Sequence, residues 1–347
     1  MTAPLRIGIL NDMASGSPGP VNIEPWLRYA AEELIGSGRL DRNVEFVHGW
    51  GLGLPTGTAA AVEHAFAALA EQDVLLIVGP AIGDNALVAT PCAEKYRIPT
   101  INWAGTERAR SNYMFHLQVG SHEDESIVLA QHMHALGAQR VGIIYDRSPI
   151  GRRHLQFFQM EAEILGLNIC ATASVAPLAK TATAEAGQIL DARPDAFVYL
   201  GLGIAAPAVA LGLGSWCGPC AMNTAGIRGY SSDFAKRIEG WTYVDMHADD
   251  NKTLSALRQK RGISAHGALN AAKGYDLGRL MAEGLARAPE RTREGVREGL
   301  EQVKFLPAAE GHEGTLLGFG NQDRGALHGR YLVLRQWRDG VSVEHKI

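Results

Sequence analysis

The chain has few cysteines, no long apolar run and no block of like charges. Its 347 residues include only four cysteines, which is too few for a fold held together by disulfides. No apolar stretch approaches the roughly 20 residues that cross a bilayer, so the sequence predicts no membrane insertion. The net charge of −4 is spread along the chain, which argues against a nucleic-acid partner.

Catalytic motifs are also scarce. The sequence contains no Gly-x-Ser-x-Gly, Ser-x-x-Lys or His-Glu-x-x-His motif, and so it offers no recognisable hydrolase set. The histidines and acids of 116–134 and of 247–250 could be metal ligands. His132 and His134, however, are two residues apart and cannot share a helix face. We interpret this segment as a polar helix in contact with solvent, and expect neither a metal nor a cofactor.

A glycine-rich loop at Gly49–Thr58 follows a strand-like segment and precedes a helical one, as a phosphate-binding loop would. It follows the second expected strand rather than the first, and no acidic residue ends the next strand. A surface turn is therefore favoured over a nucleotide site.

The string Trp216–Cys220 reads Trp-Cys-Gly-Pro-Cys, as in the active site of thioredoxins. There a helix N-terminus lowers the pKa of the first thiol. Here the string leads into a strand-like segment, so the activating helix is on the wrong side. A helix-to-strand turn is favoured over redox chemistry, and a local disulfide between Cys217 and Cys220 is left open.

Strand-like and helix-like segments alternate along the chain, which is longer than a usual single core and indicates two lobes. The expected strands are Arg6–Leu10, Val44–Val47, Val74–Val78, Ile98–Ile101, Val141–Tyr145, Leu167–Ala171, Ala196–Leu200, Cys220–Asn223, Trp241–Met246, Gly314–Phe319 and Arg330–Trp337. The expected helices are Trp26–Ile35, Thr58–Ala70, one capped by Asp84 or Asn85 that runs toward Tyr96, one that opens with a capping box at Ser121–Asp124, Ile204–Leu213, and most of 252–301. This alternation predicts an α/β fold with two doubly wound parallel sheets.

Small or polar residues follow four of these strands. The turns are Gly79-Pro80-Ala81, Asn102-Trp103-Ala104-Gly105-Thr106, Asp146-Arg147-Ser148 and Gly201-Leu202-Gly203. Ligands of open parallel α/β sheets bind outside the carboxyl ends of the strands, so we expect the function to lie in these turns.

The order of several short segments is similar to that of a known family. They are Ile7-Gly8-Ile9, Tyr29–Ile35, Ile77-Val78-Gly79-Pro80, Ile98–Ile101, Ala104-Gly105-Thr106, Val141–Asp146 with Gly151, Gly274-Tyr275-Asp276 and Gly314–Gly320. Together they resemble the type I periplasmic binding proteins, within them the branched-chain amino-acid and amide-binding group that serves ABC transporters.

The resemblance implies a non-catalytic protein whose two lobes close on a ligand like a hinge. It implies that lobe 1 comprises residues 1–118 plus 249–320, that lobe 2 comprises 119–248 plus 321–347, and that a ligand cleft lies between them. Three crossovers would join the lobes, near Leu117–Ser121, Met246–Asp250 and Gly318–Asp323.

The resemblance also implies ligand-binding positions. In lobe 1 they are Gly83, Asp84, Asn102, Trp103, Ala104, Gly105 and Thr106, and in lobe 2 they are Ser148, Ile150, Leu202, Gly203 and Ala225. The serine hydroxyls that the family uses for a ligand carboxylate are missing at Gly83 and Asp84. The acid with which the family meets a ligand ammonium aligns near Ala225, so it too is missing. A buried zwitterion without partners would cost several kcal/mol, so we expect a more apolar ligand, such as an aromatic or aliphatic carboxylate or amide.

These features favour a substrate-binding protein whose partners are a small molecule and an ABC transporter permease. A cytosolic sensor of the same fold that acts on a regulatory partner protein is the alternative, because the strand-like start at Leu5 leaves no room for a secretory signal. The expected location is the periplasm or cell surface by resemblance, and the cytoplasm if the missing signal is genuine. A redox or nucleotide-dependent enzyme is a third interpretation, based only on the cysteine pair and the glycine-rich loop.

Overall fold

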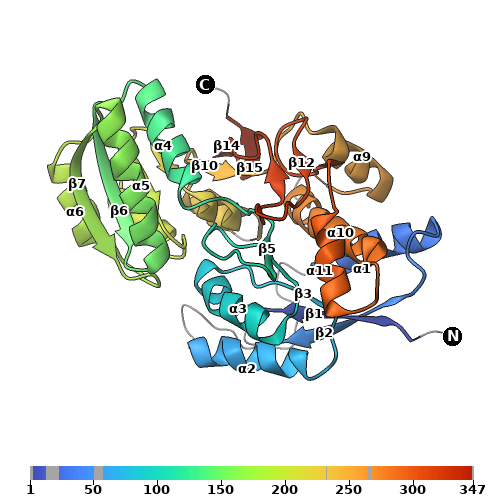
Figure 1. Ribbon diagram of the computed structural model, residues 1–347. Coiled ribbons are helices and arrows are strands. Elements are labelled where there is room, and N and C mark those ends of the chain that lie inside the picture. The colour runs from blue at the N-terminus through green and yellow to red at the C-terminus, as the bar shows by residue number, and fades with distance from the viewer. Residues whose placement is uncertain (1–2, 13–22, 51–57, 232, 265–266, 346–347) are drawn as a thin grey trace. The chain divides into compact units, whose positions relative to one another are not determined.

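The chain forms two compact units, each with its own sheet and helices (Figure 1). The computed structural model describes residues 3–12, 23–50, 58–231, 233–264 and 267–345. Unit 1 comprises Met1–Val119 and His247–Tyr331, and unit 2 comprises Gly120–Met246 and Leu332–Ile347. The chain therefore passes from one unit to the other three times.

Unit 1 is built on a five-stranded parallel sheet in the order β2-β1-β3-β4-β5. Its strands are β1 (Leu5–Leu10), β2 (Val44–Gly49), β3 (Leu76–Val78), β4 (Thr100–Asn102) and β5 (Met114–His116). On one face pack α1 (Glu24–Gly36), α10 (Ala268–Arg287) and α11 (Arg293–Glu301), and on the other α2 (Ala59–Ala70) and α3 (Gly83–Tyr96) (Figure 1).

The strands of unit 1 are apolar on both faces because both faces are covered. In β1, Ile7 and Ile9 pack with the α1 and α10 side chains, whereas Leu10 packs with those of α2 and α3. Unit 1 also contains α9 (Lys252–Arg261) and a small antiparallel sheet of β11 (Leu306–Pro307), β12 (Leu316–Leu317) and β13 (Leu327–His328). Because β13 pairs with β12, residues 321–331 lie in unit 1.

Unit 2 is built on a seven-stranded sheet in the order β15-β14-β10-β9-β8-β6-β7. Five strands are parallel, namely β6 (Arg140–Asp146), β7 (Asn168–Val175), β8 (Ala196–Leu200), β9 (Cys220–Met222) and β10 (Thr242–Asp245). Two antiparallel strands, β14 (Val333–Arg338) and β15 (Val341–Glu344), extend it.

Helices cover both faces of this second sheet (Figure 1). They are α4 (Asp124–Ala135) and α5 (Pro149–Leu165) on one face, α6 (Thr183–Asp191) on the other, α7 (Ala206–Leu213) beside α6, and the short η1 (Thr224–Ser231) and α8 (Phe234–Arg237). Gly142 of β6 lets Ile189 of α6 approach, since a Cβ there would lie 2.4 Å from the Ile189 side chain.

The two sheets repeat one topology. The order β2-β1-β3-β4-β5 of unit 1 matches the order β7-β6-β8-β9-β10 of unit 2. In such sheets the order reverses beside the first strand, and ligands bind outside the carboxyl ends at that switch point. The switch points lie between β1 and β3 in unit 1 and between β6 and β8 in unit 2.

The predicted fold class is confirmed, and the predicted strands recur, most of them with shifted ends. β5, β11, β13 and β15 were not predicted. The helix cap at Asp84 or Asn85 is wrong, because α3 begins at Gly83 and the preceding Ile82 has no side chain that caps. In the expected capping box Ser121 Oγ does accept from the Asp124 N–H at 3.0 Å.

The interpretation of 122–134 as a solvent-exposed polar helix is wrong. Glu125, Ser126 and His132 of α4 are buried, because the helix packs against α5 and carries these residues on its inner face. His132 stacks edge-on against His345, with ring centroids 5.1 Å apart. Burial lowers the pKa of His132 to about 4.

Candidate functional site

An aspartate that the sequence analysis did not select organises the switch point of unit 1. Asp12 follows β1, and its carboxylate accepts hydrogen bonds from the N–H groups of Ala81 at 2.7 Å and Ile82 at 3.3 Å. It also accepts from Asn85 Nδ2 at 2.5 Å. Burial raises the pKa of Asp12. The carboxylate thereby ties the turn after β3 and the start of α3 to the end of β1.

Asn102 shapes the turn after β4. Its Nδ2 donates to the carbonyl oxygens of Ala109 and Phe115, both at 2.9 Å, and its Oδ1 accepts from the Ala104 N–H at 3.2 Å. His116 approaches the Ala104 carbonyl oxygen from β5, with Nε2 at 2.6 Å. The Asn102 side chain is thus committed to the backbone of the turn, which it holds in place.

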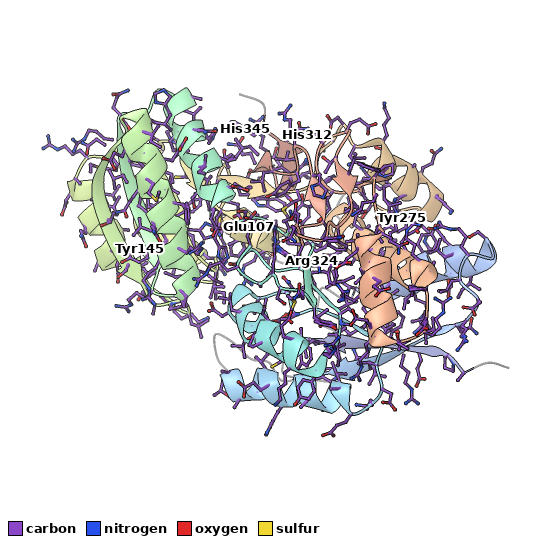
Figure 2. The ribbon with its side chains drawn as sticks, in the orientation of Figure 1. Glu107, Tyr145, Tyr275, His312, Arg324 and His345 are labelled. Atoms are coloured by element: carbon purple, nitrogen blue, oxygen red, sulfur yellow. The ribbon has the colours of Figure 1, made fainter. Side chains whose placement is uncertain are left out.

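Arg110 determines which ring nitrogen of His116 carries the proton. Its Nε donates to His116 Nδ1 at 3.1 Å, so Nδ1 is the acceptor and Nε2 carries the proton that binds Ala104. Arg110 also lies 3.7 Å from the carboxylate of Glu107, which is labelled in Figure 2.

Trp103 and Thr106 complete the group at this turn. Trp103 is half-buried against the unit 1 core, and Lys273 Nζ of α10 lies 5.4 Å from the centroid of its ring. Thr106 is only 2% exposed, and its Oγ1 accepts from the Arg108 N–H at 3.4 Å. Lys273 is 1% exposed. Lys273 was not predicted from the sequence, although a lysine that follows Ala271 and Ala272 in an apolar helix stripe is a signal for a buried cation.

Gly83 and Asp84 lie at the start of α3, where Gly83 is buried and Asp84 is half-buried in the first turn. Together with Asn102, Trp103, Ala104, Gly105 and Thr106 they stand at the carboxyl edge of the unit 1 sheet. The structure therefore brings the predicted positions of unit 1 to one edge.

Unit 2 repeats the arrangement with Asp146, the last residue of β6. Its Oδ2 accepts from the Leu202 N–H at 2.5 Å, and its Oδ1 accepts from the Ser148 N–H at 3.3 Å and from the Ser148 hydroxyl. Burial raises the pKa of Asp146. Ser148 Oγ in turn accepts from the Gly151 N–H at 2.9 Å. Ser148 is therefore the N-cap of α5. Ile150, in the first turn of that helix, is buried.

Leu202, Gly203 and Ala225 lie together beyond β8 and β9. Gly203 has a φ of +80°, and a Cβ there would lie 2.6 Å from Ala225 Cβ, so glycine is required for the two turns to touch. Arg228 of η1 lies across the same place. Its Nε donates to the Leu202 carbonyl oxygen at 2.6 Å, and its side chain is exposed. Arg228, three residues after Ala225, was not predicted from the sequence.

A buried histidine, His154, supports the turn after β8 through a hydrogen bond to Asn223. His154 Nε2 lies 3.1 Å from Asn223 Nδ2, and its Nδ1 lies 3.0 Å from Ser126 Oγ. Asn223 Nδ2 can only donate, so the proton of a neutral His154 is on Nδ1. Asn223 also bonds both backbone groups of Gly201, at 3.2 and 3.0 Å. Burial lowers the pKa of His154 well below its usual value, which keeps the ring neutral and the network intact.

The structure gives little support to the metal, redox and nucleotide sites that the sequence left as alternatives. No group of three or more possible metal-ligating side chains occurs among the described residues. Cys217 is exposed and Cys220 half-buried, and both are free thiols. Cys220 is the first residue of β9, so a strand and not a helix begins at the pair. Burial raises the pKa of Cys220 to about 12. Residues 51–57 of the glycine-rich loop lie outside the described residues.

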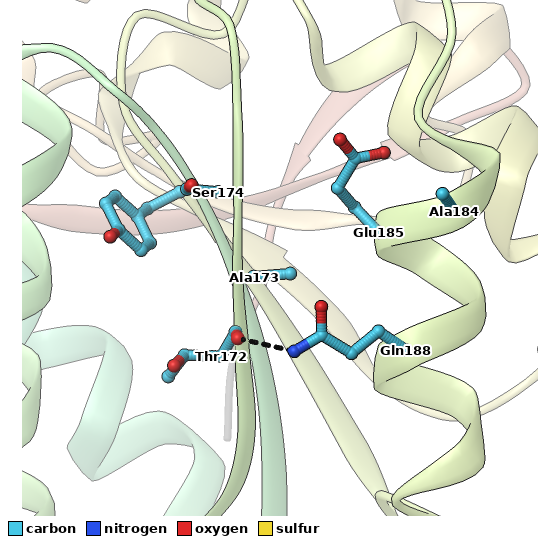
Figure 3. Close-up of a pocket in the computed structure, with 7 residues that line it drawn as sticks. Thr172, Ala173, Ser174, Ala184, Glu185 and Gln188 are labelled. Carbon is cyan, nitrogen blue, oxygen red and sulfur yellow. Dashed lines mark hydrogen bonds between the residues drawn. The ribbon is translucent and has the colours of Figure 1, made fainter.

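A polar hollow of about 410 Å³ lies in unit 2 between β7 and α6 (Figure 3). It is lined by Tyr145, Thr172, Ala173, Ser174, Ala184, Glu185 and Gln188. Gln188 Nε2 donates to the Thr172 carbonyl oxygen at 3.2 Å. The hollow follows the edge strand rather than the switch point between β6 and β8, so we do not assign it to the site. No helix in the described part of the chain is long and apolar enough to cross a membrane.

Comparison with known proteins gives one family for nearly the whole chain. The model of a family described as periplasmic binding protein matches residues 4–334. None of the curated proteins matches the sequence significantly.

Several solved structures that are described as binding proteins have a similar fold. A periplasmic binding protein type 1 from Bordetella pertussis is 17% identical with a TM-score of 0.82, over 99% of this chain and 100% of that one. A leucine binding protein from Thermotoga maritima is 17% identical with a TM-score of 0.78, over 99% and 98%. An ABC transporter substrate-binding protein from Desulfitobacterium hafniense in complex with Leu is 16% identical with a TM-score of 0.79, over 99% and 100%.

Proposed function

Because the chain belongs to the periplasmic binding protein family, we propose that it is the substrate-binding component of an ABC importer and takes a small, largely apolar organic ligand. The family supports a solute-binding role, and its structural neighbours are binding proteins rather than enzymes. We infer that the protein works in the periplasm or at the cell surface, which fractionation of cells that express the native locus would test.

One observation carries the choice of ligand. Three large apolar side chains stand among the predicted positions, namely Trp103 at the carboxyl edge of the unit 1 sheet and Ile150 and Leu202 at that of unit 2. No carboxylate stands at Ala225, where a ligand ammonium would need one. Apolar contact contributes about 25 cal/mol per Å², whereas an ammonium buried without a partner costs several kcal/mol. Zwitterionic leucine should therefore bind less well than an apolar carboxylate or amide.

Mass spectrometry of small molecules released from the purified protein tests this proposal. We expect a compound with an apolar body and no free ammonium group, and calorimetry should give it a higher affinity than leucine, isoleucine or valine. Leucine that binds at micromolar strength, or a released zwitterion, would contradict the proposed ligand class.

A further inference from the structure

Exposed apolar side chains gather on one face of unit 2. Seven large apolar side chains are exposed in the part of the chain that the structure describes, and three of them belong to α5 or to the end of α4. Met160 and Ile164 of α5 are 53% and 77% exposed, and Leu136, the C-cap of α4, is 44% exposed. Single exposed apolar side chains are common, whereas a group of them on one face marks an interaction surface.

The three side chains belong to one surface because α4 and α5 lie side by side. Both helices pack on the same face of the unit 2 sheet and run in the same direction, since α4 leads into β6 and α5 leaves it (Figure 1). Gln131 Nε2 of α4 donates to the carboxylate of Glu161 on α5 at 2.9 Å. Leu136 and Ile164 therefore both lie about one turn beyond this bond, and Met160 lies on the same side of α5 as Ile164.

The size of this surface suits a modest protein interface. α5 has 17 residues, which makes it roughly 25 Å long. Two packed helices together are about 20 Å wide. A footprint of this size is of the order that one partner contributes to a small interface.

The charges along α5 make the surface complementary to itself. Arg152 and Arg153 stand in the first half of the helix, and Glu161 and Glu163 in the second half. Arg152 and Glu163 are both exposed, and they lie about three turns apart, hence on the same side of the helix. A second α5 that runs in the opposite direction would bring each arginine beside a glutamate, whereas a parallel one would bring like charges together.

We propose that unit 2 forms a dimer with a second copy of this chain through the surface of α4 and α5, with the two α5 helices antiparallel about a two-fold axis. Arg152 of each copy then lies beside Glu163 of the other. Phe157 and Met160 lie between these two contacts, near the axis, as the core and rim of an interface are arranged. Ile164 of each copy reaches the partner copy close to its own Arg152, whose apolar stem it covers.

Analytical ultracentrifugation over a wide range of protein concentration tests this dimer. We expect the wild-type protein to approach the mass of two chains as its concentration rises, with a dissociation constant on the order of micromolar, as small interfaces give. Met160→Lys and Ile164→Lys should each raise that constant at least roughly 10-fold, because each places a charge among apolar contacts. Both side chains are exposed in the single chain, so the substitutions should leave its fold intact, which circular dichroism checks.

Exchange of the charges tests the antiparallel arrangement. Arg152→Glu places two glutamates at each contact and Glu163→Arg places two arginines there, so each variant alone should dimerise roughly 10-fold more weakly. A mixture of the two variants pairs opposite charges at both contacts and should form a mixed dimer with an affinity near that of the wild type. The double variant Arg152→Glu/Glu163→Arg should recover the dimer for the same reason.

The control variant is Leu211→Lys. Leu211 is 81% exposed, more than Ile164, but it lies on α7 beside α6, away from the proposed surface. This variant should dimerise like the wild type. A protein with the mass of one chain at every concentration would overturn the inference, as would a dimer that Leu211→Lys weakens and Ile164→Lys does not. Single-charge variants that form no mixed dimer would also overturn it. The test needs no ligand, so its result is independent of the proposed function.

Discussion

Asp12 and Asp146 do the same work at equivalent places of the two units. Each lies at the carboxyl end of the first strand of its sheet and binds backbone N–H groups of the turn after the third strand. A carboxylate offers several acceptor sites and no donor when it is ionised, so one side chain can hold a turn whose N–H groups would otherwise need water. The turns that carry the candidate site are fixed in this way before any ligand arrives.

We expect Asp12→Asn to destabilise the protein. An amide group would turn an N–H donor toward the donors of Ala81, Ile82 or Asn85, and a buried donor left without a partner costs about 1–3 kcal/mol. Asp84→Asn is the control, because Asp84 lies in the first turn of the same helix and contributes about 0.3–1 kcal/mol through the helix dipole. Urea unfolding followed by circular dichroism measures both. Equal losses would show that the bonds of Asp12 have no special weight.

Trp103→Ala should weaken ligand binding by about 1–3 kcal/mol, because a buried aromatic ring contributes a large apolar contact area. Thr106→Val should have a smaller effect through its lost hydroxyl. Trp216→Ala is the control, since Trp216 lies just before β9 at the opposite end of the strand from Ala225. Calorimetry with the released ligand is the measurement. If the Trp103 variant binds as tightly as the wild type, the ring belongs to the core alone.

At the scale of elements, the start of α4 joins three segments of unit 2. Glu125 accepts from the N–H of Ser121 at 2.6 Å and from the N–H and hydroxyl of Thr224 at 2.7 and 2.8 Å. The expected capping box would have the Asp124 side chain accept from the Ser121 N–H. In the structure Glu125 accepts this bond. The helix thereby holds both the segment where the chain enters unit 2 and the turn that contains Ala225.

Glu125 should make stability depend on pH. Burial raises its pKa to about 8 from an ordinary value of 4.5. Between these two values the unfolded chain is ionised while the folded protein keeps the proton, so the free energy of unfolding falls as pH rises. Glu125→Gln should flatten this slope, and the exposed Glu163→Gln should not. Urea titrations at several pH values from 5 to 9 compare the three proteins, and an identical slope in Glu125→Gln would reject the assignment.

The turn between α7 and β9 should be free of redox function. A thiol is activated by a helix that begins at it, whereas here Cys220 starts a strand. Replacing Cys217 and Cys220 by serine should leave ligand affinity and urea unfolding unchanged, and insulin reduction should stay at background. A reductase activity that the double variant loses would move the protein into the enzyme class.

At the scale of the whole molecule, a ligand that binds only the folded protein must stabilise it. At a concentration about 100 times its dissociation constant the gain is about 2.7 kcal/mol, which calorimetric melting detects. Hinge closure, which the family leads us to expect, should also reduce the radius of gyration in small-angle scattering. Leucine is the comparison ligand and should produce a smaller gain. Scattering that stays unchanged at saturation would exclude closure.

The amino-acid sequence by itself determined the alternation of strands and helices, and with it the fold class. Buried strands such as Val141–Tyr145 are continuous apolar runs, and helices such as Trp26–Ile35 carry an apolar stripe. These patterns are local, because neighbours along the chain report which face is buried. The positions of the turns after the strands follow from the same patterns.

Only the tertiary structure decided which polar groups meet. Asp12 bonds a turn about seventy residues away, Lys273 reaches Trp103 from α10, and Arg228 crosses Gly203 from η1. His154 and Glu125 are buried where their sequence neighbours suggest exposure. Such pairs depend on the order of strands in the sheet and on the helix that covers each face, and no local period encodes either one. The charge at the candidate site is therefore a property of the fold, although each of its residues is visible in the sequence.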